Sequence, residues 1–253
     1  MFLKIPNYFQ NPRHSISILL VGAGGTGSEI LTKLGRLAYT LNEVHQKDLM
    51  VCLCDPDKVD TPNLGRQLFT PGDIGEYKSD ILIQRMNRFF GTNWRSFPFS
   101  VSEVDFRGFN IIISCTDNVE SRKEIRKKLN YERIASENRT YFWLDTGNDF
   151  NSGNIILSSK IREIKSYLPN AFEIFGDIKN NIAVPSCSLA EAIKKQHILV
   201  NSFVADLASS MLWDILTQKK IDYQGFFFSL ETMKIVKVPV GYYKKKKHEA
   251  LSV

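Results

Sequence analysis

The chain of 253 residues lacks the features that mark membrane, secreted and zinc-binding proteins. Its apolar runs are too short to cross a bilayer, and the N-terminal segment up to Arg13 has no apolar stretch typical of a signal peptide. It has four cysteines, and none belongs to a C-x-x-C pair: Cys52, Cys54, Cys115 and Cys187. We therefore expect a cytoplasmic protein with reduced thiols, no zinc and no membrane partner.

Excess positive charge is also scarce outside one segment. The formal net charge is +6, and the four consecutive lysines from Lys244 to Lys247 leave only +2 for the rest of the chain. The hydrophobic fraction of 43% and the charged fraction of 24% are ordinary for a globular domain. We expect the folded body not to bind nucleic acid, whereas the basic tail allows weak contact with acidic partners.

Strand-like and helix-like patterns alternate through the first 157 residues. Apolar runs predict strands at 17–21, 49–54, 94–101, 110–114, 141–144 and 154–157. Helical spacing of apolar residues predicts helices at 28–39, 79–90 and about 118–129, the last with Asn118 as its N-cap. This order predicts an α/β fold, a doubly wound, Rossmann-like and mostly parallel sheet.

The last third of the chain follows a different pattern. Residues 158–188 look irregular, with prolines as punctuation. A helical pattern covers 189–219, with a possible break near His197, and 226–240 predicts a β-hairpin. We therefore expect a C-terminal helical and β-hairpin extension, with no clear domain boundary within the chain.

A glycine-rich segment joins the first predicted strand to the first predicted helix. Its glycines are Gly22, Gly24, Gly25 and Gly27. Glycines there permit a tight turn and close approach of the backbone to a phosphate, and the helix N-terminus supplies free N–H groups. The segment alone fits NAD, FAD and ATP equally well.

Two carboxylates follow the second predicted strand. Asp55 can accept hydrogen bonds from ribose hydroxyls at such a strand end. It lies 28 residues after Gly27, which is longer than the usual gap of about 20. The excess predicts an extended helix or loop between Leu37 and Asp48. A turn or helix cap is the alternative role for Asp55, and Asp57 is placed to do the same.

Further polar residues complete an ordered set of motifs. After Asp55-x-Asp57 come Asn63, Arg66 and Gln67 in an N-x-x-R-Q pattern, then Lys78, then Asp117 and Asn118 after a strand. This set, over about residues 16–157, resembles the ThiF/MoeB superfamily, which includes the ubiquitin-activating enzymes. The resemblance implies that Asp55 binds ribose, Arg66 and Lys78 bind phosphates, and Asp117 holds Mg²⁺.

The chemistry of adenylation is consistent with these residue types. Negative charge builds on phosphoryl oxygens when a carboxylate attacks the α-phosphorus of ATP and pyrophosphate leaves. Arg66 can bind such oxygens with two hydrogen bonds, and Lys78 adds a point charge. Asp117 can hold Mg²⁺ directly or through water, since this ion prefers few carboxylates and several waters. Asn63 and Gln67 could fix the nucleotide or these side chains.

The resemblance implies an enzyme that uses ATP and Mg²⁺ to adenylate the C-terminal carboxylate of a small ubiquitin-like or sulfur-carrier protein. The whole chain would be one adenylation domain, with 16–157 as nucleotide-binding core, 158–188 as crossover loop and 189–253 as C-terminal helices, hairpin and basic tail. Cys187, at a predicted helix start that would lower its pKa, would accept the acyl group as a thioester or be a small buried residue. The match from Pro185 to Trp213 resembles the ThiF proteins of PRTRC cassettes, which are bacterial.

Oligomeric state and alternative functions stay open at this point. Members of the superfamily usually form homodimers, and the apolar face from Val200 to Ile215 is either the contact surface or packed on its own sheet. Many members also place an N-terminal arginine in a partner's site, and Arg13 is either that residue or a solvated one. A catalytically weak ATP-binding interaction module is the main alternative. An NAD-dependent oxidoreductase is less consistent with Arg66, Lys78 and Asp117.

Overall fold

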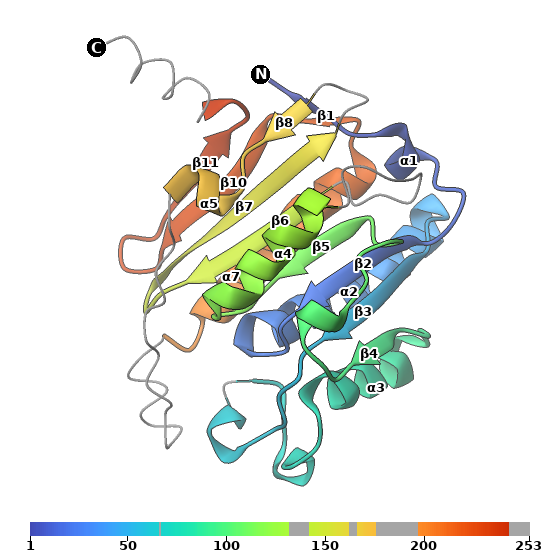
Figure 1. The fold of residues 1–253 in the computed structure, drawn as a ribbon, viewed down its shortest axis with the longest axis vertical. Coiled ribbons are helices and arrows are strands. Elements are labelled where there is room, and N and C mark those ends of the chain that lie inside the picture. Colours follow the sequence, from blue (N-terminus) through green and yellow to red (C-terminus); the bar gives the residue numbers. More distant parts are fainter. Residues whose placement is uncertain (66, 132–141, 162–165, 176–196, 243–253) are drawn as a thin grey trace.

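The computed structural model describes residues 1–65, 67–131, 142–161, 166–175 and 197–242. The strands of its main sheet are β2 (Ile16–Val21), β3 (Leu49–Cys54), β4 (Arg95–Phe97), β5 (Ile111–Ser114), β6 (Phe142–Asn148), β7 (Ser152–Ile161), β8 (Ser166–Leu168), β10 (Tyr223–Ser229) and β11 (Lys234–Pro239). Within the described residues they lie in the order β11-β10-β7-β6-β5-β2-β3-β4, with β8 paired to β7 (Figure 1).

Five of these strands form a doubly wound parallel core. β2 pairs in parallel with β3 and β5, β3 with β4, and β5 with β6. The chain therefore builds outward from β2 to β4, then crosses back over β2 to place β5 and β6 on the other side. Such a reversal is a topological switch point, where open α/β sheets bind ligands at the carboxyl ends of the strands. The predicted α/β fold class is confirmed.

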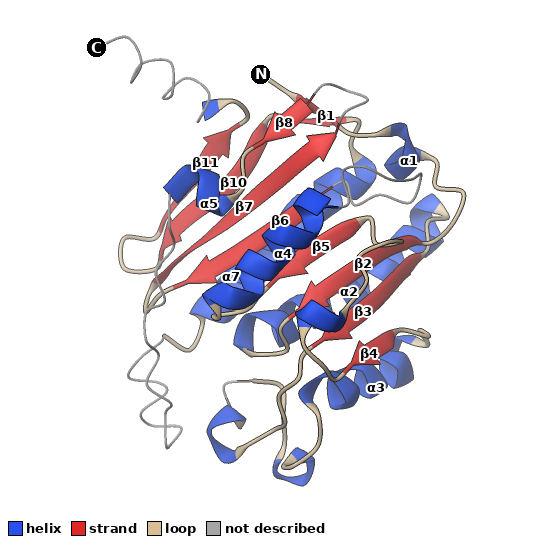
Figure 2. Cartoon of the chain, viewed as in Figure 1, coloured by secondary structure: helices blue, strands red, loops and turns tan. Residues whose placement is uncertain are grey.

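Helices cover both faces of the sheet, as the two-sided burial of its parallel strands requires. The helices are α1 (Asn7–Gln10), α2 (Gly25–His45), α3 (Lys78–Phe90), α4 (Val119–Tyr131), α5 (Ala171–Phe175) and α7 (Val200–Thr217). Apolar residues of α2, α3 and α7 pack with Ile18 and Leu20 of β2, whereas those of α4 and α5 pack with Leu19 and Val21. The alternation along β2 thus separates two cores, one on each face of the sheet. Figure 2 shows the helices that lie in front of and behind the strands.

The C-terminal third completes the same sheet. β10 and β11 form the predicted hairpin, and β10 also pairs with β7. The predicted helix at 189–219 is present as α7, and its first part lies outside the described residues. The expectation of irregular structure at 158–188 is wrong for its first half, because β7 runs to Ile161 and pairs with β8, and α5 follows. These short elements form through tertiary pairing and not through a strong local pattern.

The apolar face of α7 is interior. Val200, Val204, Met211 and Ile215 are each 0% exposed, and the helix packs against α2 and the sheet. The suggestion that this face is a dimer surface is therefore wrong, because its side chains already form the core. No helix in the described part of the chain is long and apolar enough to span a membrane.

The N-terminal segment lies at the amino ends of the parallel strands (Figure 1). A second, two-stranded sheet pairs β1 (Leu3–Lys4) with β9 (Lys220–Ile221), which follows α7. Arg13 lies between α1 and β2, and so at the edge of the sheet opposite to the glycine loop. Neither short strand was predicted, because a two-residue strand has no detectable periodicity.

Candidate functional site

The glycine loop, residues 22–27, lies between the ends of β3 and β5. Val21 is in register with Cys54 on one side and with Ser114 on the other. The N–H of Gly22 donates to the Cys54 oxygen at 2.9 Å, and the N–H of Cys115 donates to the Val21 oxygen at 2.8 Å. The loops that follow β2, β3 and β5 therefore meet at the carboxyl edge of the sheet, at the switch point.

Gly22 and Gly27 have no room for a side chain, because backbone atoms of neighbouring residues lie against them. Gly22 has φ of +98°, and a Cβ there would lie 2.9 Å from the Cys115 oxygen. A Cβ on Gly27 would lie 1.9 Å from the oxygen of Gly22. A Cβ on Gly24 would instead meet no atom of the described residues within 4 Å, and Gly24, the N-cap of α2, has no side chain with which to cap the helix. The space beside Gly24 and the first N–H groups of α2 suit an anion.

Asp55 is a buried carboxylate tied to this loop. Its Oδ2 accepts the N–H of Ala23 at 2.5 Å, and its Oδ1 accepts the N–H of Asp57 at 2.8 Å. Burial raises the pKa of Asp55 above its ordinary value, while these two N–H groups and the nearby Lys78 ammonium oppose the rise. Asp55 thus shapes the glycine loop, and each of its oxygens retains capacity for a second hydrogen bond.

Lys78 begins α3 beside these carboxylates. Its side chain is only 9% exposed, and its Nζ lies 3.1 Å from Oδ2 of Asp57, whose side chain is 65% exposed. The backbone N–H of Lys78 also donates to the backbone carbonyl oxygen of Asp57 at 2.9 Å. The structure therefore brings Asp55, Asp57 and Lys78 together on the β3 side of the glycine loop.

The segment between β3 and α3 carries the N-x-x-R-Q residues. Asn63 ends the 3₁₀-helix Thr61–Asn63, where its Oδ1 accepts the N–H of Asp60 at 2.9 Å. The Oε1 of Gln67 is buried with no hydrogen-bond partner among the described residues. Arg66 lies outside the described residues, so its predicted contact with phosphate stays a prediction.

Asp117 and Asn118 follow β5, on the other side of the glycine loop. Both are exposed. The Oδ1 of Asn118 accepts the N–H of Glu120 at 2.8 Å, which gives Asn118 the predicted role of N-cap for α4. Asp117 has an exposed carboxylate at the edge of the sheet where the loop lies. No cluster of three potential metal ligands exists among the described residues.

A buried polar cluster supports the turn that carries Asp117, and the sequence reasoning missed it. Arg122 of α4 donates through Nη2 to the backbone carbonyl oxygens of Thr116 and Thr146, at 2.9 and 2.8 Å. Its Nε lies 3.5 Å from Oδ1 of Asp145, which also accepts the hydroxyl of Ser114 at 2.5 Å. Burial raises the pKa of Asp145, and Arg122 opposes that rise. In the sequence, the signal for this cluster is Asp145 at the end of an apolar run, with Arg122 on the preceding helix.

The described cysteines are poor nucleophiles. Cys52, Cys54 and Cys115 carry free thiols. Burial raises the pKa of Cys54 and of Cys115 to about 12, which keeps both thiols protonated. Cys187 lies outside the described residues, so its proposed thioester chemistry stays a prediction.

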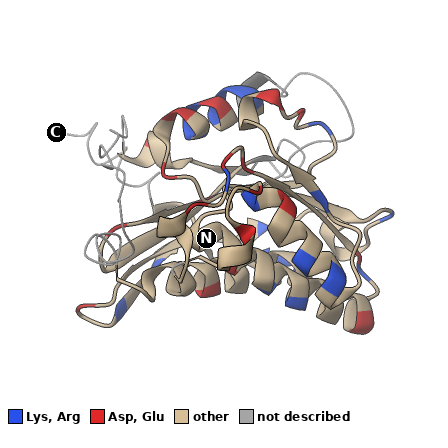
Figure 3. Cartoon of the chain, turned by 90° about the horizontal axis from the view of Figure 1, so that it is seen from below, with Lys and Arg blue, Asp and Glu red and all other residues tan. Residues whose placement is uncertain are grey.

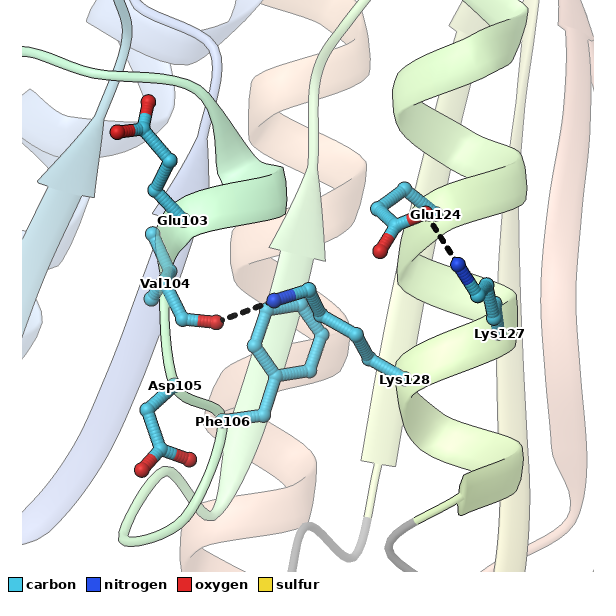
Figure 4. A pocket seen from close by; sticks show the side chains of 7 residues that line it. All are labelled: Glu103, Val104, Asp105, Phe106, Glu124, Lys127 and Lys128. Atoms are coloured by element: carbon cyan, nitrogen blue, oxygen red, sulfur yellow. Dashed lines mark hydrogen bonds and ion pairs between the residues drawn. The ribbon is translucent and has the colours of Figure 1, made fainter.

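A separate cavity of about 470 Å³ lies between α4 and the connection from β4 to β5 (Figure 4). The Nζ of Lys128, which lines this cavity, donates to the backbone carbonyl oxygens of Ser102 and Val104, at 2.8 and 2.7 Å. It also lies 5.5 Å from the centre of the Phe106 ring. These contacts tie α4 to the segment before β5, and none of the candidate site residues lines the cavity. Basic and acidic residues occur on both helical layers of the described chain (Figure 3).

Comparison with known proteins gives one family over nearly the whole chain. The model of the family described as the ThiF family matches residues 3–249. A NEDD8-activating enzyme E1 catalytic subunit from Schizosaccharomyces pombe is 30% identical over 205 residues, which cover 74% of this chain and 42% of that protein. The corresponding subunit from Dictyostelium discoideum is 30% identical over 125 residues, 47% of this chain and 26% of that protein. The chain thus matches less than half the length of these relatives.

Solved structures share the fold at low identity. Escherichia coli MccB with ATP superposes with a TM-score of 0.59 at 13% identity, over 91% of this chain and 65% of that chain. PaaA gives a TM-score of 0.60 at 16% identity, over 92% of this chain and 66% of that chain. These likenesses support the fold assignment.

Proposed function

The chain belongs to the ThiF family, and on that premise we propose that it is an ATP-dependent adenylyltransferase. Its substrate would be the C-terminal carboxylate of a small ubiquitin-like or sulfur-carrier protein. The observation that carries the proposal is the glycine loop at the switch point of the sheet, flanked by Lys78 on one side and by Asp117 on the other. Relatives named as NEDD8-activating enzymes and a neighbour solved with ATP support the same activity.

The loop is the proposed site of the phosphates. The open space beside Gly24 lets a phosphate approach the backbone, and the uncapped start of α2 offers N–H donors and partial positive charge. Phosphate oxygens would then accept N–H groups that have no partner within the helix. The carboxyl-edge location matches the general rule for ligands of doubly wound sheets.

The β3 side would hold the ribose and neutralise the phosphates. Asp55 has capacity to accept ribose hydroxyls in addition to its two backbone donors, and exposed Asp57 is the alternative acceptor. Lys78 would leave Asp57 in part to bind a phosphate oxygen. The Oε1 of Gln67, which has no hydrogen-bond partner in the described part of the chain, supports a polar ligand near the N-x-x-R-Q segment, where Arg66 and Asn63 would add contacts.

Asp117 is the proposed ligand of Mg²⁺. An exposed single carboxylate suits this ion, which keeps several waters and binds one or two carboxylates together with substrate phosphates. A site of that kind needs no preformed cluster of side chains. Mg²⁺ would offset the charge of the phosphate oxygens when it is bound. Asn118 would orient the Asp117 turn by capping α4.

The proposed reaction is an in-line displacement at the α-phosphorus. An oxygen of the substrate carboxylate bonds to that phosphorus, the bond to the bridging oxygen breaks, and pyrophosphate leaves with the electron pair. The product is an acyl adenylate, and Arg66 and Lys78 would stabilise the charge that develops. In a second step the thiolate of Cys187 would attack the acyl carbon, with AMP as leaving group, to form a thioester.

The extent of the domain, the oligomeric state and the location of the protein are also proposals. We keep the single adenylation domain over 1–253, because the hairpin and α7 share the sheet and core of the nucleotide-binding part. The homodimer and the PRTRC subfamily are proposed from the resemblance, and the cytoplasmic location is proposed from the unpaired cysteines and the apolar runs that are too short to cross a bilayer. Arg13 would act in a partner's site only if the dimer places the amino edge of one sheet near the carboxyl edge of the other.

Exchange of pyrophosphate into ATP tests the activity directly. We expect exchange in the presence of Mg²⁺ and a small ubiquitin-like protein that ends in glycine, and none with the same protein lacking its last residue. ATP binding without exchange across a panel of such proteins would contradict the enzyme and favour the interaction module. Binding of NADH in preference to ATP would favour an oxidoreductase.

Matched variants assign the exchange to this site. Lys78→Ala should reduce exchange by about a hundredfold or more, in the range seen when one charge-stabilising group is removed. Lys58→Ala is the control, since Lys58 is exposed and lies over the Tyr77 ring, 4.9 Å from its centre. Equal losses in both variants would show that Lys78 has no special role. Cys187→Ala should keep exchange and remove any thioester.

A further inference from the structure

Three polar side chains that are far apart in the sequence form a closed triangle beside the glycine loop. The hydroxyl of Thr26 donates to Oδ1 of Asn201 at 2.9 Å. Nδ2 of Asn148 donates to the Thr26 hydroxyl at 3.0 Å and to Oδ1 of Asn201 at 2.7 Å. The three residues belong to α2, the end of β6 and the first turn of α7. One hydrogen-bonded unit therefore joins three elements.

Asn201 is unusual for its surroundings. It is 4% exposed on a helix whose buried residues are otherwise apolar or small, apart from Ser209. Burying an amide is unfavourable unless hydrogen bonds satisfy it, and the triangle supplies two of them. A Cβ on Gly25 would lie 2.3 Å from Nδ2 of Asn201. Gly25 and Asn201 therefore fit against each other, and the backbone of the glycine loop rests directly on α7.

The position of the triangle on α2 distinguishes it from ordinary packing. Thr26 is the second residue of that helix, and Gly24, the N-cap, makes no side-chain cap bond. The first turn of α2 is thus held from its side, through Thr26, and within the described residues no side-chain hydrogen bond caps its N–H end. Such an arrangement fixes the backbone of the loop without occupying the space where an anion would bind.

We propose that Thr26, Asn148 and Asn201 are positioning residues that hold the glycine loop in the shape that binds the phosphates of ATP, and that they couple the loop to the start of α7. The inference rests on the proposed function for its ligand and goes beyond it in the residues that it assigns. Coupling is reciprocal, so ATP bound at the loop should stabilise the first turn of α7. Local stabilisation of this kind slows amide hydrogen exchange.

Two variants of Thr26 distinguish the effect of its hydroxyl group from the effect of its side-chain shape. Thr26→Val keeps the shape and removes the hydroxyl, whereas Thr26→Ser keeps the hydroxyl. We expect Thr26→Val to raise the dissociation constant for ATP with Mg²⁺ by about tenfold, within the usual range of coupling effects, and Thr26→Ser to restore most of the affinity. Asn148→Ala, at an exposed position, gives a second test that removes two bonds of the triangle if Thr26→Val does not fold.

Ser209→Ala is the control for a change in α7, because the Ser209 hydroxyl is buried without a partner among the described residues. It should leave ATP affinity unchanged. Hydrogen exchange gives the second readout: ATP should protect residues 198–204 in the wild type and in Ser209→Ala, but not in Thr26→Val. Equal ATP affinities in the wild type and in both triangle variants would overturn this inference and leave the proposed function intact. A wild type that binds no ATP would overturn both.

Discussion

The two sides of the glycine loop are built differently. On the β3 side the candidate ligands are themselves part of the fold: Asp55 is buried and accepts two backbone N–H groups, and the Lys78 side chain is only 9% exposed. On the β5 side the candidate ligand Asp117 is exposed. Its support lies in a separate buried layer, where Arg122 and Asp145 tie the turn to β6.

This difference predicts how function and stability should separate. Substitutions on the β3 side should affect folding and ATP binding together, because the same atoms serve both. On the β5 side, changes to Asp117 should affect activity alone, whereas changes to Asp145 should affect stability first.

Asp145→Ala should give the largest loss of stability. The substitution leaves the Arg122 guanidinium buried without its carboxylate, and breaking a buried ion pair in this way costs about 3–5 kcal/mol. The free energy of unfolding, measured in urea, should fall by that amount. Asp105→Ala breaks an exposed pair with Arg107 and should cause little change. A loss for Asp145→Ala no larger than that for Asp105→Ala would contradict a structural role on the β5 side.

Asp55→Ala should reduce both stability and ATP affinity. The N–H groups of Ala23 and Asp57 would lose their acceptor, and each unsatisfied donor costs about 1–3 kcal/mol. Urea unfolding and ATP titration of the same preparation check both effects. Asp206→Ala is the control, because Asp206 is exposed and paired with Lys33 at the surface. Normal unfolding combined with lost ATP binding would show that Asp55 is a ligand only.

Gly27→Ala should be less stable than Gly24→Ala. The new Cβ at residue 27 would meet the Gly22 oxygen at 1.9 Å, whereas one at residue 24 would meet no atom within 4 Å among the residues that the structure describes. Overpacking costs about 1–3 kcal/mol, so only the first variant should show a reduced free energy of unfolding. Equal free energies of unfolding for the two variants would mean that the loop adjusts to the added methyl group. That result would contradict the close contact between Gly27 and Gly22.

Cys54 on the β3 side of the glycine loop and Cys115 on the β5 side should both react slowly with alkylating reagents. Cys54 and Cys115 both have a pKa of about 12 through burial, against an ordinary value of 9.0. The thiol forms are thus favoured in the native state, so their contribution to stability is complete below pH 9 and decreases as the pH rises from 9 to 12. In native protein at pH 8.5 both should resist alkylation by iodoacetamide, as read by mass spectrometry. Rapid alkylation of Cys54 would contradict its burial, and rapid alkylation of Cys115 would contradict its raised pKa.

Much of the nucleotide-binding core could be predicted from local patterns. The strand ending at Cys54 has the predicted bounds, because a buried parallel strand is a continuous apolar run between polar residues. The extended gap between Gly27 and Asp55 is also explained, since α2 continues to His45. The glycine loop and the carboxylates after β3 and β5 lie at one edge of the sheet, because the order of parallel strands sets which loops meet.

The residues that support the site were not predictable in the same way. Asn201 meets Thr26 across 175 residues, and no local pattern in either segment indicates that contact. The pairing of Arg122 with Asp145 depends on β5 and β6 being neighbours, which sequence patterning does not specify. The apolar stripe of α7 likewise fits an interface and a core equally well, and only tertiary packing decides between them.

Titration with ATP and Mg²⁺ of the wild type and of Gly24→Ala tests the central claim most directly. The added methyl group meets no atom within 4 Å in the described part of the chain, so the fold should tolerate it, but it would occupy the space through which a phosphate approaches the loop. We predict an unchanged free energy of unfolding and a dissociation constant for ATP raised at least about tenfold, equivalent to 1.4 kcal/mol or more. Equal affinities in the two proteins would contradict the glycine loop as the site of the phosphates.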